Sequence, residues 1–231
     1  MNIAILSDLH GNIDAVNAVF DTFEKELVDE IIILGDIVGY YYYPEKILQL
    51  LKSYKCKIIR GNHEIILNEI LNSDIERDLI IEKYGHGHEF ALEKLSESEI
   101  NYLVNLPDEL EFIIENNSFL LRHANPWNLE DYIYENSDVN ILKNAVSGNY
   151  NFTLLGHTHY SFDFKHNNKT LINPGSVGQN RKNGGIASWV IFDTNSLRYK
   201  FMNTKYSVYK LVNEVKLIDS SNKYLYKVLE R

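Results

Sequence analysis

The 231-residue sequence contains a single cysteine, Cys56, so no disulfide can form within the chain. A lone cysteine fits the reducing cytosol, and we expect a cytoplasmic location. Although no covalent staple is available, 45% of the residues are hydrophobic, and a chain of this length can bury a large core without one. We therefore expect one domain over residues 1–231.

The sequence also lacks a long hydrophobic run. No stretch has the length of about 20 apolar residues that a membrane-spanning helix needs. The apolar N-terminal residues 2–6 soon meet Asp8 and His10, and no basic region precedes them as it would in a signal peptide. We interpret this run as the first core strand of a soluble protein, with no membrane partner.

The sequence is also poor in basic residues. It has 23 lysines and arginines against 32 acidic residues, which gives a formal net charge of −9. A negative field repels nucleic-acid backbones, and no basic stripe is evident, so nucleic acid is not an expected partner. A small phosphorylated substrate stays compatible with this charge, because bound divalent cations would dominate the local field. Both a monomer and a homodimer remain open.

The first sixty residues alternate between apolar runs and helical spacing. Strands are predicted at 2–6, 31–34 and 57–59, with helical patterns at 13–27 and from Pro44 onwards. Such a β-α-β-α-β order predicts a mainly parallel sheet in an α/β fold.

The rest of the chain changes character twice. Residues 65–106 are helical and charged, with a capping box at Ser96 and Glu99, and we expect a helical cap within the domain. Strands follow at 109–114, 118–122 and 152–155, with one helix between the last two. Two hairpins over 162–172 and 187–202 suggest a second sheet packed on the first, and the tail from Ser207 has a helical pattern.

Five short segments carry the residues that suggest chemistry. The first three begin where an apolar run ends, which in an open α/β sheet is the edge where ligands bind. The segments are Asp8-Leu9-His10, Gly35-Asp36, Gly61-Asn62-His63-Glu64, Arg122-His123 and Gly156-His157-Thr158-His159.

Carboxylate, imidazole and amide ligands suit divalent ions such as Mn²⁺, Zn²⁺ or Fe²⁺, and the absence of thiolates excludes a structural zinc finger. Two ions about 3.5–4 Å apart can share a water, lower its pKa and clamp phosphoryl oxygens. A nearby imidazole can protonate the leaving oxygen.

These motifs resemble the calcineurin-like metallophosphoesterase superfamily over residues 3–181. Residues 7–12, 35–40 and 173–178 resemble its small prokaryotic phosphodiesterase and phosphatase branch. The resemblance implies a four-layer α/β/β/α sandwich and two divalent ions, Mn²⁺ first, with Fe²⁺, Zn²⁺ or Ni²⁺ as alternatives. It also implies roles for eight residues: one metal held by Asp8, His10 and His159; the other by Asn62, His123 and His157; Asp36 bridging both; and His63 as general acid.

Two positions depart from the family pattern. Larger members have an aspartate three residues after the bridging one, which orients the catalytic histidine; here that position is Gly39, and the orienting partner of His63 is unknown. The fourth motif usually reads His-Gly but here reads His123-Ala124, and alanine resists some backbone conformations that glycine allows.

Each of the remaining candidate residues has a structural interpretation as well as a functional one. His157 and His159 would face opposite sides of a strand, whereas a loop would let both face the metals. His86 and His88 form a second His-x-His pair, which we interpret as surface or cap residues rather than ligands. Arg181 either grips a second phosphate or is solvated, and Tyr40 either stacks on a nucleobase or packs against the cap.

Together these features favour a metal-dependent phosphoesterase in which a metal-bridging hydroxide attacks a small phosphodiester, phosphomonoester or dinucleoside polyphosphate. The alternative is a non-catalytic metal-binding or metal-free interaction scaffold, as in the retromer subunit with this fold. A repair-type nuclease is disfavoured by the small size and acidic charge of the chain.

Overall fold

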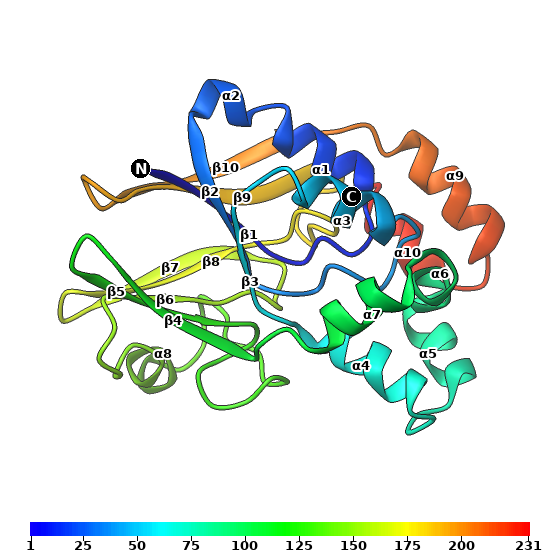
Figure 1. The fold of residues 1–231 in the computed structure, drawn as a ribbon, viewed down its shortest axis with the longest axis horizontal. Helices are drawn as coiled ribbons and strands as arrows, with labels where there is room; N and C mark the ends of the chain where they lie inside the picture. The colour runs from blue at the N-terminus through cyan, green and yellow to red at the C-terminus, as the bar shows by residue number, and fades with distance from the viewer.

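Two five-stranded β-sheets form the centre of the computed structural model, which describes residues 1–231 (Figure 1). The first sheet has the order β10-β9-β1-β2-β3 and consists of β1 (Asn2–Leu6), β2 (Val28–Ile33), β3 (Cys56–Ile58), β9 (Ile186–Asp193) and β10 (Arg198–Lys205). The second has the order β4-β5-β6-β8-β7 and consists of β4 (Glu109–Ile114), β5 (Asn117–Arg122), β6 (Phe152–Leu154), β7 (Ser161–His166) and β8 (Lys169–Pro174).

Each sheet combines three strands that pair in parallel with two strands that pair antiparallel. In the first sheet β1, β2 and β3 pair in parallel, which confirms the predicted β-α-β-α-β start. In the second, β5, β6 and β8 pair in parallel, while β4 and β7 pair antiparallel at the edges. The carboxyl ends of the parallel strands are therefore available on both sheets to carry ligand-binding loops.

One expectation about the sheets was wrong. The hairpin predicted over 187–202 does not join the second sheet, because β9 pairs antiparallel with β1 and extends the first sheet. Strand β9 is covered on both faces, with Trp189 and Val190 both fully buried, as a strand inside a sheet must be. Only the β7–β8 hairpin belongs to the second sheet.

Helices cover both outer faces and give the predicted four layers. Helices α1 (Ile13–Phe20) and α3 (Pro44–Leu51) pack on the first sheet, and the short α8 (Val139–Ala145) packs on the second. Between the sheets lies a separate apolar core that includes Ile5 and Phe192 from one side and Phe119 from the other. Burial of these faces holds the two sheets together.

The helical pattern predicted over 13–27 is interrupted in the structure. Helix α1 stops at Phe20, and the single turn α2 (Phe23–Glu26) ends at Leu27, whose φ is +52°. The side chain of Leu27 is 72% exposed, so this leucine does not continue the buried face of α1.

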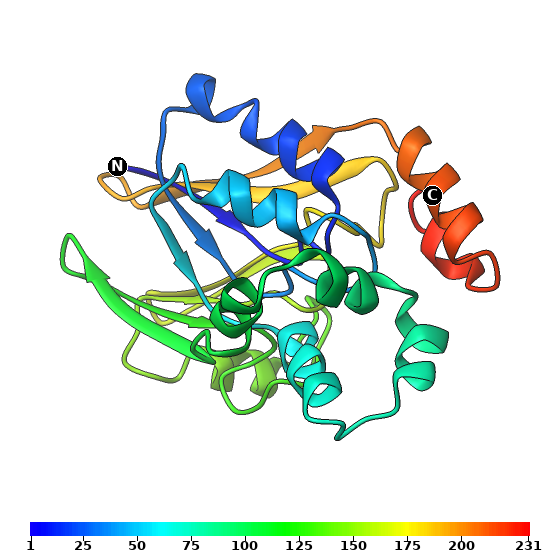
Figure 2. The ribbon, with the colours of Figure 1, turned by 45° about the vertical axis from the view of Figure 1, so that its right-hand side comes forward.

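Four helices fill the stretch between β3 and β4: α4 (Asn62–Leu71), α5 (Arg77–Tyr84), α6 (Gly87–Lys94) and α7 (Glu97–Val104). Ser96 caps α7 and forms the predicted capping box with Glu99. Figure 1 shows these helices on the same side of the molecule as α9 (Tyr209–Ile218) and α10 (Lys223–Lys227), and in Figure 2 the teal α5 lies below the red α10. No helix in the chain is both long enough and apolar enough to cross a bilayer.

The run of four tyrosines at 40–43 packs mainly into this helical end. Tyr41 and Tyr42 are buried against apolar side chains of α9 and α10, among them Val215 and Leu225. Phe90 of α6 packs on the same cluster. The C-terminal helices therefore brace both the loop after β2 and helix α6.

Candidate metal centre

Five chain segments meet at the end of the sandwich where the parallel strands finish. Loops after β1, β2, β5 and β6 and the first turn of α4 each contribute side chains. Three groups of histidine and carboxylate side chains there have ligand atoms within 4.8 Å of one another and can hold divalent metal ions: Asp8, His10 and His159; His10, Asp36 and His63; and Asp36, His123 and His157.

The first ligand group is Asp8, His10 and His159. The Nε2 atoms of the two histidines are 3.1 Å apart, and Oδ1 of Asp8 lies 3.3 Å from His159 Nε2 and 3.8 Å from His10 Nε2. Each histidine uses Nδ1 against a backbone carbonyl, that of Val38 or Gln179, so each Nε2 presents its lone pair to the other.

This arrangement fits a cation. Two imidazole lone pairs facing each other at 3.1 Å repel, and Oδ1 of Asp8 is buried without any hydrogen-bond partner. A buried, unpaired carboxylate oxygen is costly unless something positive contacts it. A divalent ion between the three side chains would satisfy all of these atoms at once.

The second ligand group is Asn62, His123 and His157. Nε2 of His123 lies 3.0 Å from Oδ1 of Asn62, while its Nδ1 is 2.6 Å from the carbonyl of Leu34. His157 is turned the other way, with Nε2 3.1 Å from the carbonyl of Glu130, so its Nδ1 is the nitrogen left for a metal. The second group therefore also consists of three side chains, which come from α4 and from the loops after β5 and β6.

Asp36 lies between the two ligand groups. Its Oδ2 is 3.8 Å from His10 Nε2 and 3.3 Å from His123 Nε2, and its Oδ1 accepts a 2.9 Å hydrogen bond from the backbone N–H of His63. That N–H belongs to the first turn of α4, whose dipole favours a negative charge. One carboxylate oxygen is held by the helix and the other faces both groups, as a bridging ligand requires.

The close packing of buried ionisable side chains in the site shifts their pKa values. Burial alone would raise the pKa of Asp8, but the neighbouring His159 lowers it to about 2. Burial alone would lower the pKa of His123, but Asp36 raises it to about 10. Burial lowers the pKa of His10 to about 3 and that of His157 to about 4, so both are neutral and ready to coordinate at neutral pH.

The site is built on unusual backbone. Five of the seven predicted ligands have φ between +48° and +65°: Asp8, His10, Asp36, His157 and His159. Such left-handed conformations cost about 1–3 kcal/mol each for residues other than glycine and concentrate at functional sites. Because His157 and His159 both adopt it in a loop, both rings turn toward the centre instead of alternating as they would in a strand.

Glu64 anchors this strained backbone, and the sequence analysis gave it no role. Its fully buried carboxylate accepts hydrogen bonds from the N–H groups of Gly61, Asp36, Ile37 and Val38, at 2.7–3.1 Å. The sequence pattern that could have indicated this role is an acidic residue three positions after Gly61, at the start of a helix. Glu64 fixes the loop that carries Asp36.

The segment 173–176 supports the site from below, in keeping with the rigid turn expected there. The Ser176 hydroxyl donates to the carbonyl of Asp8 at 2.8 Å. The Asn173 amide donates to the carbonyl of Gly156 at 2.7 Å. These contacts hold the loops after β1 and β6 in register with each other.

The departure at Ala124 has a simple structural explanation. Ala124 is buried, and its φ is not in the left-handed region, so this backbone conformation is open to any residue. Glycine's freedom is not needed here, and His123 reaches the second ligand group without it.

His63 lies beside the cluster, and its partner comes from helix α6. Burial holds the pKa of His63 well below its usual range. Its Nδ1 is 3.3 Å from Nε2 of His88, whose side chain is 1% exposed. His86 has a different environment: its ring is 38% exposed and its Nδ1 lies 2.6 Å from the buried carboxylate of Asp219.

The two predicted substrate contacts lie close to the centre. Tyr40 is 6% exposed, with its ring centroid 4.6 Å from that of His10 and 4.9 Å from that of His63, so little of it can stack on a ligand. Arg181 is partly buried, near enough to Asp8 for their charges to interact, and its Nε has no hydrogen-bond partner.

A groove of about 960 Å³ opens next to the second ligand group and includes Asn62 and His157 in its wall. Its aromatic members are Tyr84 of α5 with Trp127 and Tyr132 of the loop before α8. The ring of Tyr132 stacks on His157, with centroids 4.1 Å apart and planes 19° apart.

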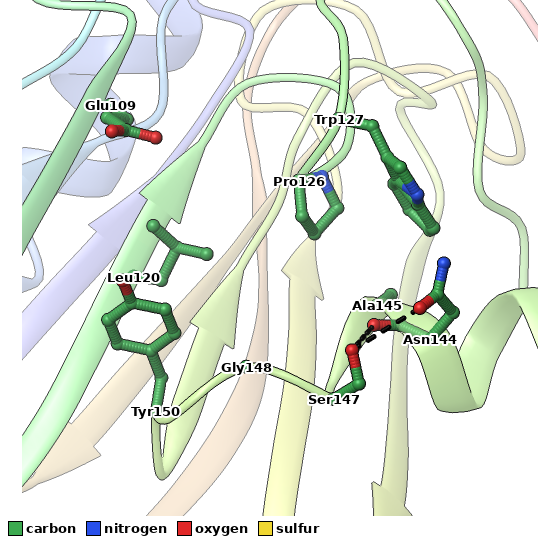
Figure 3. Close-up of a pocket in the computed structure, with 9 residues that line it drawn as sticks. All are labelled: Glu109, Leu120, Pro126, Trp127, Asn144, Ala145, Ser147, Gly148 and Tyr150. Atoms are coloured by element: carbon green, nitrogen blue, oxygen red, sulfur yellow. Dashed lines mark hydrogen bonds between the residues drawn. The ribbon is translucent and has the colours of Figure 1, made fainter.

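A separate cavity of about 330 Å³ lies between β5 and α8 (Figure 3) and has none of the predicted ligands in its wall. There Ser147 donates hydrogen bonds to Asn144, and Trp127 lies across from them. Of these two spaces, only the larger groove has predicted ligands in its wall, Asn62 and His157.

Comparisons of sequence and of structure relate this chain to known proteins. The sequence profile of the calcineurin-like phosphoesterase superfamily domain matches residues 1–197. An uncharacterised protein from Methanocaldococcus jannaschii is 28% identical over 234 residues, covering 92% of this chain and 91% of that protein.

Two crystal structures share the fold over nearly their whole length. A hypothetical protein from Pyrococcus horikoshii OT3 superposes with a TM-score of 0.83 at 23% identity, covering 99% of this chain and 97% of the other. A metallophosphoesterase from Sphaerobacter thermophilus gives a TM-score of 0.79 at 24% identity, covering 100% and 99%.

Proposed function

The chain belongs to the calcineurin-like phosphoesterase superfamily, and from this membership we propose that it hydrolyses small phosphoesters with the help of two divalent metal ions. The observation that carries the proposal is the position of Asp36, whose Oδ2 faces a ligand group on either side. A lone metal site has no use for a carboxylate so placed, whereas a paired site needs one.

Mn²⁺ is our first candidate, with Fe²⁺, Zn²⁺ or Ni²⁺ as alternatives, because a mixed set of imidazole, carboxylate and amide ligands accepts all of them. Asp8, His10 and His159 would hold one ion, and Asn62, His123 and His157 the other. When bound, the ions would make a water more acidic and draw electrons from the phosphoryl oxygens.

The protein's own side chains do the rest. Asp36 keeps the two ligand groups in fixed relation, and the backbone N–H of His63 keeps Asp36 from rotating. As the water oxygen bonds to phosphorus, the bond to the leaving oxygen breaks, and that oxygen must gain a proton. The attacking water releases that proton, and His63, with Nδ1 turned toward His88, has its Nε2–H free to hydrogen-bond to the leaving oxygen as negative charge develops there.

The groove beside the second ligand group supports a substrate larger than inorganic phosphate. Three aromatic side chains, Tyr84, Trp127 and Tyr132, suit a flat leaving group such as a nucleoside or an aryl alcohol. Its charged side chains are Lys83 and Arg122 on one hand and Glu69, Glu130 and Asp131 on the other.

Because acidic groups outnumber basic ones, the groove favours a phosphomonoester or phosphodiester over a dinucleoside polyphosphate, although Arg181 could pair with one further phosphate. We propose a small phosphorylated molecule as the partner, no membrane or nucleic acid, action in the cytoplasm, and a monomer or homodimer.

The test is hydrolysis of bis(p-nitrophenyl) phosphate and p-nitrophenyl phosphate by metal-stripped protein, with and without Mn²⁺. We expect turnover only with metal. Asp36→Asn is the matched variant, since it keeps the size of the side chain and removes the bridging charge; it should be inactive while retaining the wild-type circular dichroism spectrum. Activity that survives complete metal removal, or unchanged turnover in Asp36→Asn, would overturn the proposal.

A further inference from the structure

The position that carries an orienting aspartate in larger family members has no room for one here. A Cβ added at Gly39 would lie 2.1 Å from Nδ1 of His63, and Gly39 has a φ of +85°, which side-chain-bearing residues rarely adopt. The His63 ring occupies the space that a side chain at 39 would need. Its orientation must come from another residue.

His88 is positioned to orient the His63 ring. Its Nε2 lies 3.3 Å from Nδ1 of His63, and the planes of the two rings are only 8° apart. Both side chains are at most 2% exposed, so water does not compete for this hydrogen bond. Nδ1 of His63 has no other partner within hydrogen-bonding distance.

A second glycine allows this contact. A Cβ on Gly87 would lie 2.5 Å from the backbone nitrogen of Tyr40, so helix α6 can reach the loop after β2 only because residue 87 has no side chain. The close approach brings the next residue, His88, against His63. Glycines at 39 and 87 thus shape one compact contact from both sides.

The proton positions follow from the hydrogen bonds. Nδ1 of His88 is buried and has no partner. A bare ring nitrogen there costs less than an unpaired N–H, which places the His88 proton on Nε2, donating to His63 Nδ1. His63 then carries its own proton on Nε2, the nitrogen left to face Asp36 and His10.

We propose that His88 is the positioning residue of the site, which fixes both the orientation of the His63 ring and its Nε2–H tautomer. His88 is a member of neither ligand group and does not line the substrate groove; the rings beside it are those of His63 and of Tyr84, whose centroid is 6.3 Å away. We assign its action to the hydrogen bond with His63. The inference rests on the proposed function for the role of His63 and on the contact geometry for everything else.

The kinetic test compares esters with good and poor leaving groups in His88→Phe, His88→Gln and wild-type protein, all loaded with Mn²⁺. Phenylalanine keeps the ring but loses the hydrogen bond, whereas glutamine can place a polar atom near the imidazole Nε2. For p-nitrophenyl phosphate, whose leaving oxygen needs little stabilisation, we expect kcat of His88→Phe within about threefold of wild type. For phenyl phosphate we expect a loss of about 10²-fold at unchanged KM, the scale of one misplaced hydrogen-bond donor to a developing negative charge.

His88→Gln should recover most of the loss on phenyl phosphate, and it provides a folded variant if phenylalanine disturbs α6. His86→Gln, on the same helix but facing Asp219, is the matched control and should behave as wild type on both esters. Equal losses on both esters in His88→Phe, or no loss on either, would overturn the proposal while leaving the proposed hydrolase intact.

A measurement independent of turnover is the ring ¹⁵N spectrum of His63 in metal-free and Zn²⁺-loaded protein. We expect a protonated Nε2 and an unprotonated Nδ1 in wild type, and averaged tautomers in His88→Phe. An identical His63 spectrum in both proteins would overturn the proposal. If wild type hydrolyses no ester with any metal, the proposed function fails, and this spectrum still decides whether His88 fixes His63.

Discussion

The protein contains two His-x-His pairs that share a spacing and almost nothing else. His157 and His159 sit in the loop after β6, both with left-handed backbone, at φ of +65° and +64°. His86 and His88 stand at the start of helix α6, where φ is negative. In the loop, both rings turn toward the same centre and reach different ligand groups, one near His123 and one near His10.

In the helix, residues two apart are rotated by about 200° around the axis, because a turn takes about 3.6 residues. His86 accordingly reaches Asp219, and His88 reaches His63 on the other side. The two pairs teach that the spacing of histidines says little until the backbone between them is known. Strained backbone makes one pair convergent, and regular backbone makes the other divergent.

The largest expected effect separates the pairs directly. Replacing His159 with alanine removes one of three side chains of the first ligand group, and metal ions supply several kcal/mol of transition-state stabilisation, so we expect hydrolysis to fall by about 10³-fold. His86→Ala should retain at least about a third of wild-type activity. Metal content measured by mass spectrometry should drop only in His159→Ala; a fully metal-loaded and active His159→Ala would remove this histidine from the site.

A substitution at position 39 tests the contact between His88 and His63 from the other side of the His63 ring. In Gly39→Ala the new Cβ would collide with Nδ1 of His63 and push the ring away from His88. A displacement of about 1 Å can cost about 10²-fold in rate, and we expect a loss of that order in kcat. Binding of Mn²⁺, followed by calorimetry, should stay within a few-fold of wild type. Wild-type kcat in this variant would show that the His63–His88 contact is not needed.

Proton release on metal addition should distinguish two of the predicted ligands, His123 and His157, by their charge. His157 is already neutral, whereas Asp36 raises the pKa of His123 from 6.5 to about 10 in the metal-free protein. The protonated form of His123 therefore stabilises the metal-free fold fully below pH 6.5, and this stabilisation is lost as the pH rises through about 10. A metal at this nitrogen must displace the proton.

We expect metal binding between these pH values to release about one proton and to strengthen about tenfold per pH unit. Calorimetry in buffers of different ionisation enthalpy measures both quantities. In His123→Asn the release should vanish. Binding that is independent of pH in wild-type protein would contradict a protonated His123.

The smallest effect is expected at the far end of the helical pair. Asp219→Asn keeps the shape of the side chain but weakens its hydrogen bonds with His86 and Tyr42, at 2.6 Å each. We expect a loss of about 2 kcal/mol in unfolding free energy, or a fall of about 4–8 °C in Tm, because buried charged acceptors contribute about that much. Hydrolysis should change by less than about threefold. A thermal scan of Asp219→Asn beside Asp163→Asn, a surface carboxylate bonded to Tyr199, separates this loss from a general charge effect.

The sequence was informative where chemistry sits at the end of a strand. Asp8 and Asp36 each follow an apolar run, and parallel strands place such residues at one edge, so their proximity was predictable without coordinates. The sandwich itself followed from the order of strands and helices together with the family motifs. The structure brings the seven predicted ligands within reach of one another, and their roles remain proposals.

What the sequence could not supply depends on how distant elements approach each other. His88 lies in the first turn of α6 with no local pattern that marks a function, and only the close approach of α6 at Gly87 brings it against His63. Strand β9 was assigned to the wrong sheet because antiparallel addition to β1 leaves no local mark in the sequence. The role of Glu64 was missed because its four N–H donors come from two separate loops.

The link between Asp219 and His86 also has a consequence for the order of events on the ribosome. All seven predicted ligands precede residue 160, and the turn that supports Asp8 is complete by Ser176. The carboxylate that holds His86 is made some forty residues later, on the last pair of helices. Because a domain folds as a unit and β9, which pairs with β1, also follows Ser176, a nascent chain would complete its ligand groups and the fastening of α6 together, after the last helices have emerged. Metal capture and the alignment of His63 would then both be closing steps of maturation.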